Sequence, residues 1–187
     1  MREDLNVAVQ VLKKGGVILY PTDTIWGIGC DATNPDAVSR IYTIKQRSDS
    51  RSMLVLLDDA AGLERYLREV PEVAWDLIEL SEEPLTIIYP GAKNLAKNLV
   101  APDGTIGIRI VRDDFCKNLI RQFRKPIVST SANVSGKSWP ANFNTIDPGI
   151  LRQVDYTVKW RQEDRAKGKP SAIIRLGING EIEIIRK

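Results

Sequence analysis

Short apolar runs alternate along the chain with segments in which hydrophobic residues recur every three or four positions. The first pattern is typical of buried strands and the second of amphipathic helices. We expect helices at 4–14, from residue 34 through Lys45, at 59–68, at 71–80 and at 113–123. We expect strands at 17–20, 25–31, 53–57, 85–89, 106–110 and 126–133, and further strands near 154–159, 171–176 and 181–185.

Turn and cap residues mark the ends of these elements. The glycine pair at 15–16 stops the first helix, and the Asn-Pro-Asp sequence at 34–36 begins the second. The apolar run at 53–57 is typical of a strand covered on both faces. Strands that alternate with helices predict a single α/β domain over residues 1–187. An Asn-Gly hairpin signal at 179–180 joins the last two strands, so we expect a mixed sheet.

One stretch, at about 135–150, has no periodic pattern and is rich in Pro, Gly, Asn and Ser. A stretch of this kind is either a mobile flap beside a site or a long surface connection. The sequence leaves both interpretations open.

The composition narrows the chemistry available to the chain. Its 187 residues include no histidine, which excludes Ser-His and Cys-His nucleophile pairs and HExxH zinc sites. The two cysteines, Cys30 and Cys116, are too few for a disulfide framework, and we expect both to be buried and inert. A net charge of +3 permits an anionic ligand or RNA without requiring either. We therefore expect a protein that binds and orients charged reactants.

Several familiar signals are absent. The chain has no apolar run long enough to span a membrane, and its first residues are acidic where a signal peptide is basic, so we expect a cytoplasmic protein. The SGKS sequence at 135–138 resembles the end of a P-loop, but Ser131 stands where that motif requires its first glycine. No basic arm or aromatic-basic interleaving specifies nucleic-acid recognition.

Small polar residues adjoin three of the expected strands. These clusters are YPTDT at 20–24, STSAN at 129–133 and KPSA at 169–172, and we interpret each as following an apolar strand. Ligands gather outside the carboxyl ends of strands in open α/β sheets, so the clusters could converge on one ligand. Alternatively, each cluster only caps a helix or shapes a turn.

A basic segment, KQRSDSR at 45–51, precedes the strand at 53–57. Its cations Lys45, Arg47 and Arg51 are suited to a phosphate clamp, because lysine supplies a point charge and arginine a two-pronged donor. They are equally suited to an exposed basic cap at the end of the helix, where cations favour the negative end of the helix dipole.

Arg109 lies in the middle of the apolar strand TIGIRI. A charge in that position needs a partner or a wet cavity. Its partner is either a carboxylate or phosphate of a ligand, or an acidic residue of the protein.

In their order and spacing these segments resemble the YrdC-like threonylcarbamoyl-AMP synthases. The matching segments are YPTDTIWGIGCDA, IYTIKQRSDSRSMLVLL, PLTIIYPG, IGIRI, IVSTSANVSG and KPSAIIRL, which cover about residues 5–186. They contain counterparts of the KxR and SxN signatures of that family, Lys45/Arg47 and Ser131/Asn133. The resemblance implies a twisted, open mixed α/β sheet with flanking helices around a large positively charged cavity.

The resemblance also implies a reaction, in which L-threonine, bicarbonate and ATP give threonylcarbamoyl-AMP and pyrophosphate. Mg²⁺ is expected to accompany ATP. The carbamate formed from threonine and bicarbonate can attack the α-phosphate itself, so the enzyme supplies alignment and charge neutralisation without a histidine. The product feeds threonylcarbamoyladenosine synthesis in tRNA, where downstream threonylcarbamoyl-transfer proteins act.

Roles carried over from the family by position fall into four groups. The residues implied to hold threonine are Thr24, Arg109, Ser129 and Ser171. The residues implied to line the ATP side are Arg47, Arg51, Thr105, Ser131 and Arg186. The implied catalytic residues are the signature pairs Lys45, Arg47, Ser131 and Asn133, which act on phosphate or on the reacting carbamate. Asp23 is a candidate to hold Mg²⁺ through water.

The chain departs from the family pattern at four positions, of which Ser48, Ser52 and Trp139 concern the ATP side. Ser48 and Ser52 replace two prolines, Glu83 replaces a glycine, and Trp139 stands where a serine often contacts the nucleotide. These departures admit a paralogue with a different acceptor or weak activity.

Two other functions remain open at this point. One is a non-catalytic RNA-binding or ribosome-assembly protein that uses the same basic concavity for tRNA or double-stranded RNA. The other is carbamoyl-adenylate chemistry on another amine or on carbamoyl phosphate, as in the related domain of hydrogenase-maturation proteins.

Overall fold

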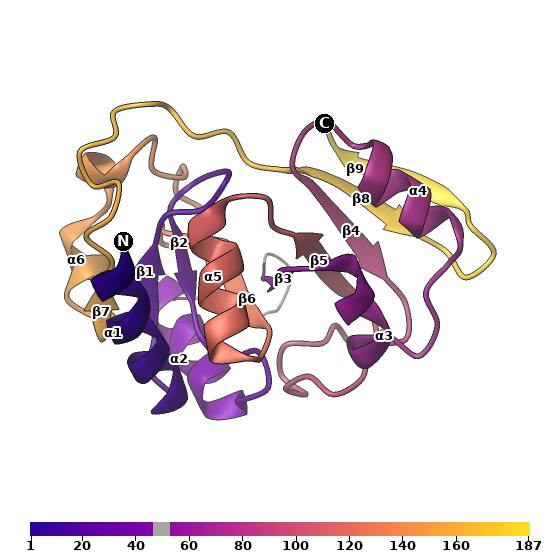
Figure 1. Cartoon of the computed structure of the whole chain (residues 1–187), viewed down its shortest axis with the longest axis horizontal. Coiled ribbons are helices and arrows are strands. Elements are labelled where there is room, and N and C mark those ends of the chain that lie inside the picture. Colours follow the sequence, from indigo (N-terminus) through magenta and orange to yellow (C-terminus); the bar gives the residue numbers. More distant parts are fainter. Residues whose placement is uncertain (47–52) are drawn as a thin grey trace.

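The computed structural model describes residues 1–46 and 53–187, whose strands form a nine-stranded sheet with helices packed against it (Figure 1). The helices are α1 (Arg2–Lys13), α2 (Pro35–Lys45), α3 (Leu63–Tyr66), α4 (Val73–Leu80), α5 (Asp114–Phe123) and α6 (Pro148–Leu151), with 3₁₀ turns η1 (Ala60–Gly62) and η2 (Phe143–Thr145). The strands are β1 (Ile18–Tyr20), β2 (Gly27–Gly29), β3 (Leu54–Leu57), β4 (Leu85–Tyr89), β5 (Ile106–Ile110), β6 (Ile127–Ser131), β7 (Tyr156–Thr157), β8 (Ala172–Leu176) and β9 (Ile182–Arg186).

The sheet is mixed, as expected from the sequence. Its strand order is β7-β1-β2-β6-β3-β5-β4-β8-β9. The pairs β1/β7, β3/β5 and β4/β8 are parallel, and the remaining neighbours are antiparallel. In Figure 1, α1 and α5 lie near β1 and β6, whereas α3 and α4 lie in the half of the molecule that contains β4 and β5. The α/β class with flanking helices is therefore confirmed.

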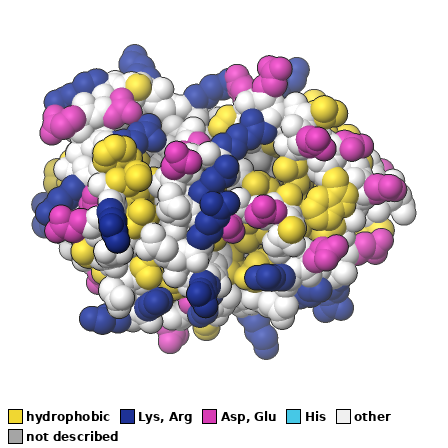
Figure 2. Space-filling view, viewed as in Figure 1, with side chains coloured by type: hydrophobic (Ala, Val, Ile, Leu, Met, Phe, Trp, Pro, Cys, Tyr) yellow, Lys and Arg dark blue, Asp and Glu magenta, His cyan; other side chains and the backbone are white. Residues whose placement is uncertain are grey.

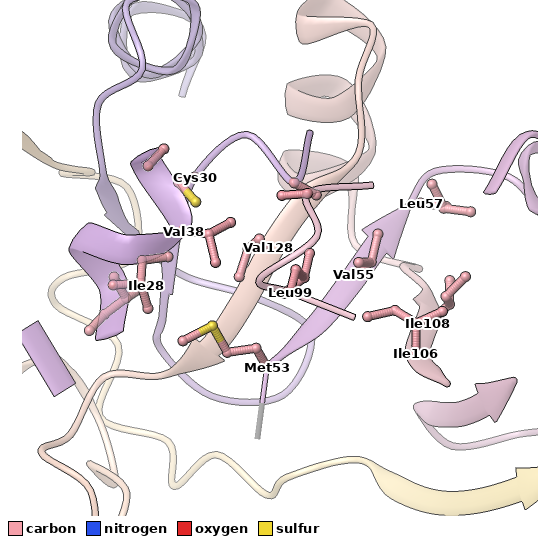
Figure 3. Packing of buried hydrophobic residues seen from close by; sticks show 14 of the residues in the cluster. Ile28, Cys30, Val38, Met53, Val55, Leu57, Leu99, Ile106, Ile108 and Val128 are labelled. Atoms are coloured by element: carbon pink, nitrogen blue, oxygen red, sulfur yellow. The ribbon is translucent and has the colours of Figure 1, made fainter. Parts of the chain in front are cut away.

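The central strand β3 is covered on both faces, as its continuous apolar run predicts. Leu56 belongs to a hydrophobic cluster with residues of α1 and α5, whereas Val55 and Leu57 belong to a second cluster with residues of α2. Part of the second cluster appears in Figure 3, where Val55 lies close to residues of neighbouring strands. Successive side chains point to opposite faces of a strand, so β3 joins the two halves of the core.

Most expected elements are confirmed, with ends that shift by a few residues. The strands expected at 85–89 and 106–110 coincide with β4 and β5. Helix α2 begins as expected, because the Asn34 side chain accepts hydrogen bonds from the backbone N–H groups of Asp36 and Ala37, and a proline occupies the first turn. Cys30 and Cys116 are both buried and unpaired, and burial raises the pKa of each thiol, which makes both unreactive.

The single helix expected at 59–68 is wrong. The segment forms η1 and the one-turn helix α3, with Gly62 at the junction. Leu67 then adopts an extended backbone and forms an isolated β-bridge with Ala92. A tertiary contact that the local pattern does not reveal therefore ends the helix early.

Two other segments differ from the prediction, one in the length of its strand and the other in its regular structure. The strand expected at 154–159 is reduced to the two residues of β7, and the Asp155 carboxylate beside it binds the Val17 N–H. The irregular stretch at 135–150 contains η2 and α6, and its Phe143 ring packs 4.9 Å from that of Trp26. This contact anchors the stretch against the start of β2.

The lengths and polarities of the described helices can be compared with those of a membrane-spanning helix. Within residues 1–46 and 53–187, every helix is too short or too polar to cross a bilayer.

Gly29 should be among the positions where the fold tolerates least change. A Cβ atom there would lie 2.5 Å from the Val128 carbonyl oxygen and 2.6 Å from the Tyr20 ring. Because backbone must move to admit the methyl group, we expect Gly29→Ala to lower the free energy of unfolding by about 3 kcal/mol, measured by urea titration. The control is Gly107→Ala, whose new Cβ would make ordinary contacts at 3.5 Å. Equal losses in the two variants would contradict this account of β2.

Candidate functional site

A cavity of about 950 Å³ opens beside the ends and faces of the central strands, at the upper end of the size range of ligand pockets. Its lining comes from β2, β3, β4, β5, β6, β8 and β9, from the end of α2, from the segments that follow β1, β4 and β6, and from the segment that precedes β8. It includes nine of the residues that the sequence singled out: Thr24, Lys45, Thr105, Arg109, Ser129, Ser131, Asn133, Ser171 and Arg186. Arg47 and Arg51 lie outside the described residues.

The lining is strongly cationic. Among the described residues it contains five positively charged side chains and one carboxylate, that of Asp103. The cations are Lys45, Arg109, Lys137, Arg175 and Arg186. The pKa of Arg186 is lowered by burial and by repulsion from Arg109, which indicates that these two guanidinium groups lie close together. Like charges held together in a cavity are suited to a ligand with several negative charges.

Lys45 is buried at the end of α2, with 2% of its surface exposed. Its ammonium nitrogen donates to the backbone carbonyl oxygens of Ser131 (2.6 Å) and Asn133 (2.8 Å). The carbonyl of Lys45 in turn accepts from the Ser135 N–H at 3.0 Å. The interpretation of Lys45 as an exposed cap is therefore wrong, and the residue ties α2 to the turn after β6. These contacts bring one residue of each signature pair, Lys45 and Ser131, to the same point of the cavity.

The polar turn after β1 is a hydrogen-bonded unit. The Thr22 hydroxyl donates to the Ile25 carbonyl (2.7 Å) and accepts from the Thr24 N–H (3.1 Å). The two threonine hydroxyl oxygens lie 2.9 Å apart, and that of Thr24 accepts from Arg109 Nη1 at 3.1 Å. The turn thus holds the guanidinium group of Arg109 from one side.

Asp23 holds the same guanidinium group electrostatically. Arg109 has 3% of its surface exposed, and its Nη2 lies 3.0 Å from Asp23 Oδ1. Asp23 Oδ1 makes this ion pair without a hydrogen bond, and the Nε atom of Arg109 also has no hydrogen-bond partner among the described residues. Of the two partners that the sequence allowed for Arg109, the structure therefore shows an acidic residue, and it leaves a donor for a ligand. Nearby, burial and then the charge of Asp23 raise the pKa of Asp113.

Ser171 lies at the beginning of a strand and not at its end. The interpretation of KPSA as a cluster that follows a strand is therefore wrong, because β8 starts at Ala172. The Ser171 hydroxyl is 2.7 Å from that of Thr86, and its carbonyl accepts from Arg186 Nε and Nη2 at 3.0 and 2.8 Å. In a mixed sheet, opposite ends of different strands border the same cavity, so the carboxyl-end rule did not apply here.

Thr105 lies at the cavity beside its one described carboxylate. Its N–H and hydroxyl both donate to Asp103 Oδ1, at 3.0 and 2.7 Å. These hydrogen bonds, the hydroxyl first, lower the pKa of Asp103.

A second cavity of about 390 Å³ lies on the other side of the wall formed by Thr24, Ile25 and Pro170, residues that line both cavities. Asp23 faces this second cavity. Its carboxylate is already engaged by Arg109 and by the Arg112 N–H at 3.2 Å. The described residues contain no group of three or more His, Cys, Asp or Glu side chains suited to a metal.

Several lining residues were not singled out from the sequence. Arg175 lies in the middle of the apolar strand β8, so the signal that pointed to Arg109 would also have found it. Lys137 comes from the irregular stretch after β6, as does Trp139, which the sequence had marked as a departure from the family pattern. Lys137 belongs to the SGKS sequence, which borders the cavity without being a P-loop. Thr86 lies in an apolar strand, where nothing in the sequence singled it out. Its hydroxyl contact with Ser171 shows that it belongs to the site.

The chain is similar to proteins of known families. The Sua5/YciO/YrdC family model, described as telomere recombination, matches residues 10–187. A threonylcarbamoyl-AMP synthase of Pseudoalteromonas translucida is 32% identical over 181 residues, which cover 95% of each chain. The structure of E. coli YciO superposes with a TM-score of 0.86 at 27% identity, over 100% of this chain and 90% of that one.

A structure of P. abyssi Sua5 complexed with L-threonine has the same fold. It superposes with a TM-score of 0.81 at 24% identity and covers 92% of this chain and 50% of that one. The match of the family model over most of the sequence, with full-length relatives above 30% identity, is decisive. The chain belongs to the Sua5/YciO/YrdC family.

Proposed function

We propose that this protein is an L-threonylcarbamoyladenylate synthase, which forms threonylcarbamoyl-AMP and pyrophosphate from L-threonine, bicarbonate and ATP. The observation that carries the proposal is the 950 Å³ cavity, whose described lining holds five cations, one carboxylate and hydroxyl groups from several strands. A triphosphate needs such an excess of positive charge, and an amino acid needs donors for its carboxylate. The relatives named threonylcarbamoyl-AMP synthase support the same activity.

The threonine subsite of this proposal surrounds Arg109. Its guanidinium group is oriented by Thr24 and Asp23 and keeps the Nε donor without a partner among the described residues. A ligand carboxylate supplies the oxygen that a buried donor of this kind requires. Ser129 and Ser171 line the same cavity and are the proposed neighbours of the substrate side chain and amine.

The nucleotide subsite of this proposal lies in the part of the cavity that the threonine subsite does not occupy. Thr105, Ser131 and Arg186, with Arg47 and Arg51 from the segment outside the described residues, are the proposed contacts of ATP. Lys45 and Asn133 complete the signature pairs. Because Lys45 already holds the carbonyls of Ser131 and Asn133, its proposed role is to position this turn against the phosphates.

The proposed reaction needs no histidine. The threonine amine attacks the carbon of bicarbonate, and loss of water leaves a carbamate. A carbamate oxygen then attacks the α-phosphorus, the bond to the β-phosphate breaks, and pyrophosphate leaves. Holding the two reactants in line and neutralising the developing negative charge are the contributions that the cationic cavity can make.

Mg²⁺ fits this site as a companion of ATP. The described lining offers one carboxylate, Asp103, and Asp23 is engaged by Arg109, so the described residues provide no cage for the ion. Mg²⁺ in nucleotide sites is commonly held by phosphate oxygens with one or two carboxylates, and it neutralises phosphate charge. Asp23 stays a candidate for contact through water.

The proposal also includes the cellular location of the enzyme and the proteins that use its product. We expect the protein to act in the cytoplasm and to pass its product to downstream threonylcarbamoyl-transfer proteins that modify tRNA. The adenylate is a mixed anhydride and hydrolyses readily, which favours transfer close to the place of synthesis.

A pyrophosphate-release assay tests the activity. We expect release from ATP only when threonine and bicarbonate are both present, with a threonylcarbamoyl adenylate detectable by mass spectrometry. Omission of either substrate is the matched control. Release that needs neither threonine nor bicarbonate would overturn the proposal. Release that accepts other amines equally well would point to the carbamoyl-adenylate alternative.

The RNA-binding alternative predicts different experimental results. It requires tRNA binding by the purified protein that persists in Lys45→Ala and does not depend on nucleotide. That result, together with no pyrophosphate release, would replace the synthase by a non-catalytic function. The burial of Arg109 beside a ligand-sized cavity favours the synthase, because RNA phosphates are contacted mainly by exposed cations.

A further inference from the structure

Trp139 is the one aromatic side chain among the described residues that line the 950 Å³ cavity. It keeps 50% of its surface exposed, and it makes no contact with another aromatic ring in the described part of the chain. A half-exposed tryptophan leaves much apolar surface in contact with water, which is unfavourable. A ligand that covered the ring would remove this surface from water.

The backbone is held in place on both sides of Trp139. Before it, the Ser135 N–H donates to the carbonyl of the last residue of α2 at 3.0 Å. After it, the Ala141 carbonyl accepts from the N–H of Gly168, in the segment that leads into β8, at 3.0 Å. The buried Pro140 also favours an extended backbone at Trp139. The segment that carries the ring is therefore ordered before a ligand binds, which lowers the entropic cost of binding.

Positive charge alone does not distinguish a nucleotide from another polyanion. Figure 2 shows Lys and Arg side chains over much of one face of the molecule, so cations are not confined to the cavity. Cations hold phosphates whichever molecule carries them. A nucleotide also has a flat base, which stacks on aromatic side chains. Lys137 lines the same cavity as Trp139, two residues away, so one short segment offers both a cation and a stacking surface.

We propose that the indole ring of Trp139 stacks on the adenine base of ATP. The inference rests on the proposed function, because it takes ATP as the ligand of the 950 Å³ cavity. Stacking uses the face of the base and not its hydrogen-bonding edge, so it gives affinity for any purine nucleotide. Trp139 therefore separates nucleotides from other polyphosphates and does not select adenine over guanine.

Calorimetric titrations with ATP and with inorganic tripolyphosphate, which carries phosphates without a base, test the stacking contact. We expect Trp139→Leu to raise the dissociation constant of ATP by about tenfold and to leave that of tripolyphosphate unchanged, because only the base loses its stacking surface. Trp139→Phe keeps an aromatic ring and should retain most of the affinity for ATP. The matched control is Trp160→Leu, because Trp160 is 42% exposed and lines neither cavity. This control should bind ATP as the unchanged protein does.

Two results of these titrations would overturn the inference and leave the proposed function intact. One is an affinity for ATP that Trp139→Leu does not change. The other is an equal loss of affinity for ATP and for tripolyphosphate, which would show that the side chain acts on the phosphates and not on the base. If the unchanged protein binds no ATP, the inference and the proposed function fail together, so the two failures can be distinguished.

Tryptophan fluorescence reports the same contact without relying on affinity. We expect ATP, and not tripolyphosphate, to quench the emission of the unchanged protein and of Trp160→Leu. In Trp139→Phe this quenching should disappear while ATP still binds. Quenching that persists in Trp139→Phe would come from another tryptophan and would refute the assignment. Quenching by a short single-stranded RNA and none by ATP would also refute it, because the ring would then contact RNA.

Discussion

Arg109→Ala should strongly reduce threonine-dependent pyrophosphate release and also destabilise the fold. The substitution removes the donors proposed for the threonine carboxylate, and truncating one member of a buried charge pair costs roughly 2–5 kcal/mol. We therefore expect kcat/KM for threonine to fall on the order of a hundred- to a thousandfold. It also leaves Asp23 buried without its cation, which should lower the free energy of unfolding by about 3–5 kcal/mol. Steady-state kinetics and urea unfolding measure the two effects.

A second variant separates the two effects. In Arg109→Ala/Asp23→Asn the stranded carboxylate is gone, while the asparagine side chain can still accept from the Arg112 N–H. We expect this variant to regain most of the lost stability and none of the lost activity. If activity returns together with stability, Arg109 acts through folding alone, and its assignment to the threonine carboxylate is wrong.

Lys45→Met should cost both stability and turnover. The methionine fills a similar volume but leaves the carbonyl oxygens of Ser131 and Asn133 without the ammonium donor. The Ser131 carbonyl keeps the Asn133 N–H as a donor at 2.9 Å, whereas the Asn133 carbonyl loses its donor. A buried polar group without a partner costs about 1–3 kcal/mol, so we expect the free energy of unfolding to fall by about 1–3 kcal/mol. Because the turn after β6 loses its anchor, we expect kcat to fall by roughly a hundredfold at temperatures where the variant is still folded.

The matched control is Lys137→Met, the same change at another lysine of the cavity. The Lys137 side chain is 67% exposed, and its nearest carboxylate oxygen, on Asp147, is 3.6 Å away. An exposed pair of this kind contributes little to stability, so the melting temperature should stay unchanged and only the KM for ATP should rise. Equal behaviour of the two variants would show that the buried position of Lys45 has no special importance.

The fold could be predicted from the sequence to a large extent, because burial and hydrogen bonding act locally on each strand and helix. The apolar run at 53–57 predicted a strand covered on both faces, and β3 is such a strand. The Asn34 cap predicted the beginning of α2. Where prediction failed, as for the helix expected at 59–68, a contact with a distant residue decided the backbone conformation.

The candidate site was predicted less completely. The resemblance to the YrdC-like family supplied most of its residues, and each one that the structure describes lines one of the two cavities. Thr86 was missed because an uncharged polar residue inside an apolar strand does not reveal which face of the sheet it occupies, and Arg175 was missed although the signal that pointed to Arg109 also marks it. Ser171 was assigned to the wrong end of its strand, although the strand expected near 171–176 already places KPSA at its beginning.

The sequence by itself determined the α/β class, the presence of three polar clusters and a basic segment, and the exclusion of histidine chemistry, because these properties follow from residue types and their spacing. Only the tertiary structure decided that Lys45 is buried against the turn after β6 and that Asp23 and Thr24 hold Arg109. Those contacts join residues more than eighty positions apart. Their energies depend on distance and burial, which exist only once the chain has folded.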